Sequence, residues 1–205
     1  MKQKHFIDSH KGATAIAVLG LMAYYDQWAN HTLWVYLATH GLYGLLWIHK
    51  SLSFGDKQWE QKTGIGYGLV IWGGLSLYWV APWLIASRGS EAPPWVMGLA
   101  VAMFGLGVFY HFTSDMQKHT QLALKRGLIT EGLWSRTRNP NDFGEFLIYA
   151  GFSLLAVHWA PFVALAIFVG AIWVPNMLRK DKSISRYPEF AAYKRRTGLF
   201  FPKLF

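Results

Sequence analysis

The chain has 205 residues, of which 53% are hydrophobic and 15% are charged, and it contains 11 Trp, 10 Tyr and 14 Phe. This composition is richer in apolar and aromatic residues than that of an ordinary soluble domain. There is no cysteine, which excludes disulfides, thiolate metal sites and cysteine nucleophiles. A formal net charge of +9 would suit nucleic-acid binding, but the basic residues border apolar segments and not a soluble surface.

Six apolar stretches follow one another along the chain, and each is a candidate transmembrane helix. A spanning helix needs about 20 mostly apolar residues, so the third and fourth stretches are long enough and the other four are short. Trp and Tyr lie at the ends of several stretches, as they do at membrane interfaces, whereas buried helices of a soluble protein have no such reason to place them there. The stretches are 13–28, 32–48, 65–86, 94–113, 143–157 and 161–178.

The first stretch follows three lysines, as the apolar part of a signal peptide would. It is followed by residues 24–28 (YYDQW), which contain no small-residue cleavage site, so we expect a retained first span. The short polar segments 29–31 and 158–160 are expected to be tight connections between spans.

Basic residues are distributed very unevenly between the two sides of a six-span protein. The N-terminus, the loops 49–64 and 114–142 and the tail from Arg179 lie on one side, with 3, 3, 5 and 8 Lys or Arg residues. These are 19 of the 20, and only Arg88 lies opposite. Since cytoplasmic loops carry such an excess, all four segments should face the cytoplasm. The prediction is an all-α, polytopic helical bundle of about six spans, one integral membrane domain over 1–205, with a cytoplasmic amphipathic C-terminal tail.

The segment before the fifth stretch carries signals for a helix start. Pro140 biases the residue before it away from helix and can itself begin one. Asn141 or Asp142 is then expected to cap a helix that runs from Phe143.

Arginines, amides and an acid gather at this helix start. Arg136 and Arg138 beside a helix N-terminus suit a phosphate or another anion. The alternative is that both arginines only orient the chain in the membrane. Glu145 lies about one turn inside the expected span, where an acidic residue is rare unless it is paired or faces a cavity, and this favours a functional role.

Residues 138–145 (RNPNDFGE) resemble the R-H-P-N-Y-x-G-D/E motif of the membrane-embedded sterol reductases and the related steroid 5-alpha-reductases. Upstream, 114–118 (SDMQK) is similar to their S-D and N-x-Q-K elements, and 132–134 (GLW) is similar to their G-L-F or G-W-W turn. Downstream, 179–193 and 201–202 are similar to the R-x-D…Y-x-x-x-x-x-Y tail and its aromatic–Pro end. The resemblance covers nearly half of the chain, in matching order and spacing.

This superfamily includes two chemistries. The reductases use NADPH to reduce a carbon–carbon double bond of a lipid, whereas the isoprenylcysteine carboxyl methyltransferases bind S-adenosylmethionine with an R-H-P motif and paired glutamates in the tail. Here Asn139 stands in place of the His, and the tail has no paired glutamates but only Asp181 without an adjacent acid, so the pattern favours the reductase. The methyltransferase remains the alternative. Asn139 and Asp142 also depart from the His and Tyr of the sterol-reductase motif.

The resemblance implies that 107–205 binds the cofactor and that 1–106 provides spans on the substrate side. In this interpretation cations hold the phosphates of NADPH, acids and amides hold its ribose or nicotinamide, and the tail closes the site. The implied cofactor-binding residues are Lys118, Arg136 and Arg138, then Asp115, Asn141 and Glu145, and from the tail Arg179, Asp181 and Tyr193.

Reduction of an enone also needs a proton donor or an electrophile near the carbonyl. His40, Tyr43, Trp47 and Lys50 share one face of the second stretch. A tyrosine of an early span has this role in the steroid 5-alpha-reductases, so the resemblance implies Tyr43 as the catalytic residue, with His40 as its polar neighbour. The alternative is that Tyr43 is a packing or interface aromatic and that His40 is a hydrogen-bonded helix residue.

Other functions have less support in the sequence. The eight histidines form no H-x-x-x-H or similar cluster, which argues against a metal site, and no Walker A, G-x-S-x-G or Rossmann motif is present. A membrane scaffold or transporter is the non-enzymatic alternative, although its spans would carry more polar residues at depth. The expected partners are a lipophilic substrate and membrane lipids, without nucleic acid or metal. The expected location is a bacterial inner membrane or the endoplasmic reticulum, with both termini cytoplasmic.

Overall fold

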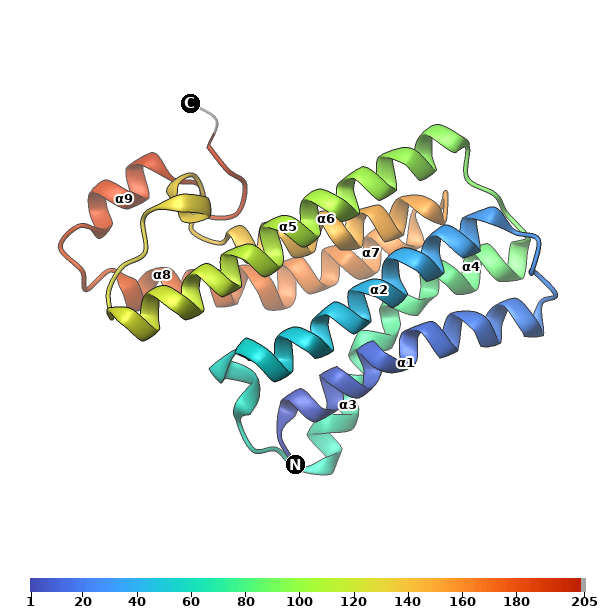
Figure 1. Cartoon of the computed structure of the whole chain (residues 1–205), viewed down its shortest axis with the longest axis horizontal. Coiled ribbons are helices and arrows are strands. Elements are labelled where there is room, and N and C mark those ends of the chain that lie inside the picture. The colour runs from blue at the N-terminus through green and yellow to red at the C-terminus, as the bar shows by residue number, and fades with distance from the viewer. Residues whose placement is uncertain (204–205) are drawn as a thin grey trace. The chain divides into compact units, whose positions relative to one another are not determined.

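The computed structural model describes residues 1–203, which form helices joined by short connections (Figure 1). Within this range there are isolated bridges, between Lys2 and Lys62 and between Thr137 and Gly198, but no strand. The prediction of an all-α fold is therefore confirmed. The α-helices are α1 (Gln3–Tyr24), α2 (His31–Phe54), α3 (Ile65–Leu75), α4 (Val80–Arg88), α5 (Pro94–Leu124), α6 (Pro140–Leu155), α7 (Ala160–Phe168), α8 (Val174–Ile184) and α9 (Phe190–Arg196).

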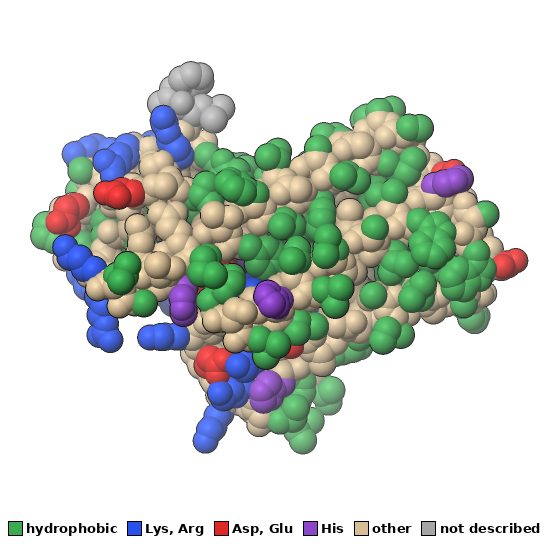
Figure 2. Space-filling view, in the orientation of Figure 1, with side chains coloured by type: hydrophobic (Ala, Val, Ile, Leu, Met, Phe, Trp, Pro, Cys, Tyr) green, Lys and Arg blue, Asp and Glu red, His purple; other side chains and the backbone are tan. Residues whose placement is uncertain are grey.

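Three continuous helical segments are long and apolar enough to cross a membrane. They are Ile65–Arg88, Pro94–Leu124 and Ala160–Ile184, with 24, 31 and 25 residues. The first joins α3 to α4 through a 3-10 turn, and the third joins α7 to α8 through a π-helical turn. Hydrophobic side chains spread over the visible faces of the helices (Figure 2), as expected for helices that contact lipid. These helices support a membrane protein, while the count of six spans stays a prediction.

The helix α6 has 16 residues, which is shorter than a full span. At about 1.5 Å per residue it extends about 24 Å, against a hydrocarbon core of about 30 Å. It begins at Pro140 and not at Phe143, because the fixed φ of proline and its missing N–H suit the first helical position. The backbone N–H of Phe143 donates to Asn139 O at 3.0 Å. The prediction that Asn141 or Asp142 caps a helix from Phe143 is therefore wrong, since both lie in the first turn.

Two other helices extend beyond their predicted bounds. The helix α5 continues past residue 113 to Leu124, because the polar segment 114–124 contains neither Gly nor Pro to stop it. The helix α1 begins at Gln3, so Lys11 lies well inside it and not before it. Lys11 is one of the three lysines predicted to precede the first span, and this prediction is wrong for Lys11 because it lies inside a helix.

The predicted tight connections are present, and local signals explain them. Asn30 caps α2, because its side-chain oxygen accepts a hydrogen bond from Leu33 N at 3.1 Å. At the second connection, His158 Nδ1 accepts from Ala160 N at 3.1 Å, where α7 begins. The helix α4 ends at Gly89 with φ +59°, a conformation that favours glycine.

The chain divides into two compact units. The first contains Met1–Phe104 and Tyr149–Ala164, and the second contains Gly105–Ile148 and the described residues from Leu165 on. In the first unit α1 packs along α2, and α3 and α4 pack on α1. A Cβ added at Gly44 of α2 would collide with the backbone oxygen of Lys11, so a glycine is needed for this close approach. The core of this unit includes Tyr36, Tyr43 and Met22.

Candidate functional site

In the second unit, α5 and α6 approach each other closely through two glycines. A Cβ built on Gly107 would lie 2.6 Å from Gly144 O, and one on Gly144 would meet the backbone of His111. His111 is buried, and its Nδ1 lies 3.0 Å from the backbone oxygen of Asn141. This contact brings the polar side chains of α5 beside the first turn of α6.

A cluster of charged side chains forms at this first turn, which we call the α6 polar cluster: Asp115, Lys118, Asn141, Asp142, Glu145 and Lys180. Burial raises the pKa of Asp142 to about 7. Lys180 and Lys118 act against this rise, whereas the carboxylates of Glu145 and Asp115 add to it. These electrostatic interactions place α5, α6 and α8 residues around one carboxyl group. The structure thus brings together Asp115, Lys118, Asn141 and Glu145 from the predicted set.

Asn141 carries an unsatisfied polar atom within this cluster. Its backbone oxygen faces His111, but its buried side-chain Oδ1 has no hydrogen-bond partner among residues 1–203. Buried acceptors are normally paired, so an acceptor without a partner marks a place where a ligand or water donates. The motif predicts Asn141 as a binding residue, and its unsatisfied Oδ1 adds a chemical reason for that prediction.

Arg138 lies beside the cluster but is held by the protein itself. Its side chain is 5% exposed, and its Nε donates to both carboxylate oxygens of Asp181, at 2.9 and 3.0 Å. Its Nη1 donates to the backbone oxygen and the hydroxyl of Thr197, at 2.8 and 3.2 Å. The predicted phosphate ligand Arg138 and the predicted tail acid Asp181 therefore form one buried ion pair that joins the start of α6 to α8 and to the segment after α9.

Backbone contacts strengthen this junction. Arg138 N donates to Gly198 O at 2.9 Å, and Gly198 N donates to Arg136 O at 3.0 Å. Asn139 Nδ2 donates to Leu199 O at 2.6 Å. The position at which the motif departs from His thus carries an amide that fixes the C-terminal segment.

Tyr193 and Lys180 also contact the segment before α6. The Tyr193 hydroxyl donates to Trp134 O at 2.8 Å, and burial raises the pKa of Tyr193 to about 12. Lys180 Nζ donates to Arg138 O at 2.7 Å and lies 4.6 Å from the centroid of the Trp134 ring. Lys180 is not among the predicted site residues. It directly precedes the predicted residue Asp181 in the sequence RKDK, and this position is the signal that could have identified it.

The remaining predicted cations of this unit are on the surface. Arg179 is exposed, and Arg136 is exposed in an open groove of about 650 Å³ that Arg196 also lines. Figure 2 shows Lys and Arg side chains gathered around α9. Arg136 and Arg179 are thus accessible to an anionic ligand, as Arg138 is not.

The predicted catalytic residues belong to the first unit. Tyr43 and His40 are both fully buried in α2. His40 Nδ1 lies 2.8 Å from the hydroxyl of Tyr36, and its ring stacks on Phe152 with centroids 4.2 Å apart. His40 and Tyr43 are neighbours, with ring centroids 6.4 Å apart, as their spacing on one helix face predicted.

Two residues that contact Tyr43 are not among the predicted site residues. The ammonium of Lys11 donates to the hydroxyl of Tyr149, and its Nζ lies 4.2 Å from the centroid of the Tyr43 ring. Tyr149 itself packs edge-on against Tyr43, with centroids 5.8 Å apart. The sequence offers a lysine directly before an apolar run and a tyrosine four residues after Glu145 on the same helix face, but neither signal indicates that the two side chains meet.

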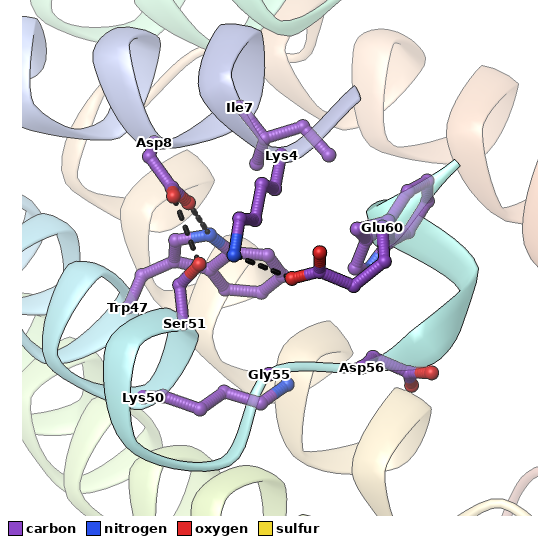
Figure 3. A pocket seen from close by; sticks show the side chains of 10 residues that line it. Lys4, Ile7, Asp8, Trp47, Lys50, Ser51, Gly55, Asp56 and Glu60 are labelled. Carbon is purple, nitrogen blue, oxygen red and sulfur yellow. Dashed lines mark hydrogen bonds and ion pairs between the residues drawn. The ribbon is translucent and has the colours of Figure 1, made fainter. Parts of the chain in front are cut away.

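Trp47 completes the surroundings of Lys11 and is fixed in place by Asp8. The carboxylate of Asp8 accepts from Trp47 Nε1 at 3.1 Å and from Ser51 Oγ at 2.8 Å (Figure 3). Trp47 and Lys50 also line a small pocket of about 10 Å³, which is room for about one water molecule. Residues 1–203 contain no group of three or more His, Asp or Glu side chains able to hold a metal ion.

Comparison with known proteins gives a family but no activity. Residues 57–198 match the model of a family described as "Protein of unknown function (DUF1295)". A curated relative, the uncharacterized protein C594.04c of Schizosaccharomyces pombe, is 32% identical over 94 residues. That match covers 42% of this chain and 27% of the relative, so the chain spans only about a quarter of the relative's length. No solved structure matches this chain.

Proposed function

The chain belongs to the DUF1295 family, and we propose that it is a membrane-bound reductase that uses NADPH to reduce a carbon–carbon double bond of a lipophilic enone. The observation that carries the proposal is the α6 polar cluster, in which carboxylates, lysines and an amide meet at one helix start. The motifs of residues 107–205, which resemble those of the sterol reductases and steroid 5-alpha-reductases, fall in and around this cluster.

The donor set of the cluster fits a pyridine dinucleotide. The unsatisfied Oδ1 of Asn141 suits a carboxamide or ribose donor, and Asp115 and Glu145 supply further acceptors. Lys118 supplies a point charge suited to a phosphate, and the exposed Arg136 and Arg179 supply planar donors. When bound, NADPH supplies the hydride, while these residues hold and orient it.

In this proposal Arg138 and Asp181 support the site without contacting the cofactor. Because Arg138 is committed to Asp181 and Thr197, we assign it the role of fixing the start of α6 and not that of a direct phosphate ligand. Tyr193 has the same kind of role through its hydrogen bond to Trp134 O.

The same ion pair favours the reductase over the methyltransferase. The related methyltransferases use paired glutamates of the tail, whereas this tail has no adjacent pair of acids, and both carboxylate oxygens of Asp181 accept from Arg138. An S-adenosylmethionine site would lack that acidic partner. The methyltransferase is therefore the alternative that the first experiment must distinguish.

Tyr43 is our candidate for the proton donor to the substrate. It is buried beside His40 and Lys11, away from water, where a phenol can act on a lipophilic ketone without competition from solvent. The substrate class is a steroid-like, sterol-like or prenyl-lipid enone that enters from the bilayer.

The proposed orientation has six spans with both termini in the cytoplasm. It rests on the excess of Lys and Arg on one side of such an arrangement. The membrane is a bacterial inner membrane or the endoplasmic reticulum. Soluble NADPH can reach the α6 polar cluster in this orientation, since the cluster lies at the predicted cytoplasmic end of its span.

Calorimetry on the detergent-purified protein tests the proposal directly. NADPH and S-adenosylmethionine are titrated separately, and we expect heat of binding with NADPH alone. Binding of S-adenosylmethionine alone would replace the reductase with the methyltransferase. Binding of neither would leave a membrane scaffold or transporter as the remaining function. A positive NADPH titration is followed by the decay of NADPH absorbance with a panel of steroid and prenyl enones.

A further inference from the structure

Lys11 is a cation in the interior of the first unit. Its side chain belongs to α1, and the residue is 3% exposed. The ammonium donates to the Tyr149 hydroxyl, and its Nζ lies 4.2, 4.8 and 4.9 Å from the ring centroids of Tyr43, Trp47 and Tyr149. Three separate helices, α1, α2 and α6, therefore contribute to the surroundings of one positive charge.

Such a position is costly for the protein. A lysine loses its hydration when it is buried, and hydrogen bonds and cation–π contacts within the protein must replace that hydration. Ionisable residues inside membrane proteins are rare for this reason and mark functional sites. A merely apolar contact among the three helices could have been made by leucine or methionine at no such cost.

The pairing with Tyr149 gives the charge a chemical use. A hydroxyl that accepts a hydrogen bond from an ammonium becomes a stronger hydrogen-bond donor, because the positive charge stabilises negative charge that develops on its oxygen. The aromatic surroundings exclude water, so this effect is not screened. An ammonium–phenol pair of this kind is suited to an oxygen that gains negative charge during a reaction.

The chemistry of an enone matches this pair. When hydride adds to the carbon β to the ketone, the electron pair of the double bond moves toward the carbonyl oxygen, and a proton later adds to the α carbon. The group that polarises the carbonyl must therefore be a fixed donor in a dry place. A neutral ketone can enter a dry site from the bilayer, whereas the transfer of an anion from water into that site would be very unfavourable.

We propose that Lys11 and Tyr149 form the site that binds the carbonyl oxygen of the substrate. Lys11 supplies the positive charge, and the hydroxyl of Tyr149 donates a hydrogen bond to the carbonyl oxygen. This inference rests on the proposed function, since it names the group that makes the enone electrophilic. Tyr43, which lies against both residues, retains the role of proton donor to the carbon. Trp47 covers Lys11 and is held by its hydrogen bond to Asp8.

The test uses binding of a coloured ketone in the absence of NADPH. A conjugated trienone steroid absorbs at longer wavelength than tryptophan, and its band shifts further to the red when its carbonyl accepts a strong hydrogen bond. The detergent-purified full chain is titrated with this probe, and we expect a red shift on binding. Lys11→Met removes the ammonium and keeps an unbranched side chain, and Tyr149→Phe removes only the hydroxyl.

Both variants should lose the red shift and bind the probe about tenfold more weakly, as expected for loss of a hydrogen bond to a charged group. The matched control is Lys50→Met, because Lys50 is also buried and its Nζ lies 4.9 Å from the Trp47 ring centroid. It should keep the full shift. If Lys11→Met does not yield monodisperse protein, Tyr149→Phe alone decides the question.

Three results would overturn the inference: no binding of the probe by the unaltered protein, binding without a red shift, or a shift that survives in Tyr149→Phe. These results are separable from failure of the proposed function. A red shift that depends on Tyr149 in a protein that neither binds NADPH nor oxidises it with any enone refutes the reductase and keeps the carbonyl site. NADPH-dependent reduction of the trienone without the red shift supports the reductase and refutes the carbonyl site.

Discussion

The two units of this protein bury a cation in very different ways. In the second unit, Arg138 donates to a carboxylate, a backbone carbonyl and a hydroxyl, all supplied by the chain itself. In the first unit, Lys11 donates to a phenol and faces three aromatic rings. The guanidinium is planar and its donors match fixed acceptors, whereas the ammonium is a point charge that polarises whatever lies beside it.

This difference teaches that burial of a cation does not by itself reveal its role. Arg138 lies in the motif that resembles the reductases, yet its contacts are those of a structural junction. Lys11 lies outside every motif, yet it contacts a phenol and aromatic rings in the carbonyl site that we propose. The partners of each cation decide the assignment.

Replacement of Arg138 should cause the largest loss of stability. Arg138→Ala leaves the buried carboxylate of Asp181 without its partner, which is expected to lower the free energy of unfolding by about 3–5 kcal/mol. Lys11→Met leaves the neutral hydroxyl of Tyr149, and not a charge, without its donor, so it should lower that free energy by only about 1–2 kcal/mol. Thermal unfolding in detergent measures both.

The double variant Arg138→Leu with Asp181→Leu provides the control for this comparison, and it should recover most of the lost stability, because neither charge is left alone. If Lys11→Met lowers the free energy of unfolding as much as Arg138→Ala does, the two cations do not differ in role, and Lys11 is a structural residue. The exposed Arg136→Ala should be neutral in the same assay.

Glycine substitutions sharpen the comparison by loosening each unit separately. Gly144→Ala places a Cβ against the backbone of α5, and Gly44→Ala places one against the backbone of α1 at Lys11. Each should cost about 1–3 kcal/mol through overpacking. Gly144→Ala should also weaken NADPH binding, and Gly44→Ala should reduce the red shift of the trienone. Gly98→Ala, which meets nothing within 4 Å, should change none of these, and an equal loss there would discredit the packing argument.

Glu145→Gln tests the second unit as the cofactor site. Removal of the carboxylate keeps the side-chain shape and should weaken NADPH binding about tenfold, or about 1.4 kcal/mol, without loss of folded protein. Calorimetric titration measures the affinity. Glu189→Gln, at an exposed position before α9, serves as the control and should bind as the unaltered protein does. Equal affinity in all three proteins would return Glu145 to a role in the helix dipole.

Asp142 should make stability depend on pH near neutrality. Because burial raises its pKa from 3.8 to about 7, the folded state holds the proton more tightly than the unfolded state does. Its contribution is fully present below the unfolded pKa and is lost as pH rises through the folded pKa. Stability should fall by about 1 kcal/mol between about pH 6 and about pH 8, and Asp142→Asn should remove that slope. The thermal midpoints of both proteins are measured across this pH range. If the midpoint of Asp142→Asn depends on pH as strongly as that of the unaltered protein, Asp142 is not the group responsible.

Much of the fold could be predicted because it depends on local pattern. The polar connection at Asn30, the helix stop at Gly89 and the turn at His158 follow from the preferences of single residues. Helix ends were less predictable, since hydropathy marks the apolar part of a helix and not its length. The helix α5 therefore continues to Leu124 through a polar segment that has no helix breaker.

The site was predictable only in part. The motif around Asn141 and Glu145 identified the α6 polar cluster, because those residues are close in the chain. The pairing of Arg138 with Asp181 joins positions 43 residues apart, and that of Lys11 with Tyr149 joins positions 138 apart. No local pattern reports such contacts.

By itself, the sequence determined that the chain is helical and apolar, that its basic residues are segregated, and that residues 138–145 begin a helix with charged groups beside it. The tertiary structure alone decided which buried cation is paired with a carboxylate and which faces aromatic rings. The physical reason is that hydropathy and helix propensity act over a few neighbouring residues, whereas the environment of a buried charge is assembled from helices distant in the chain.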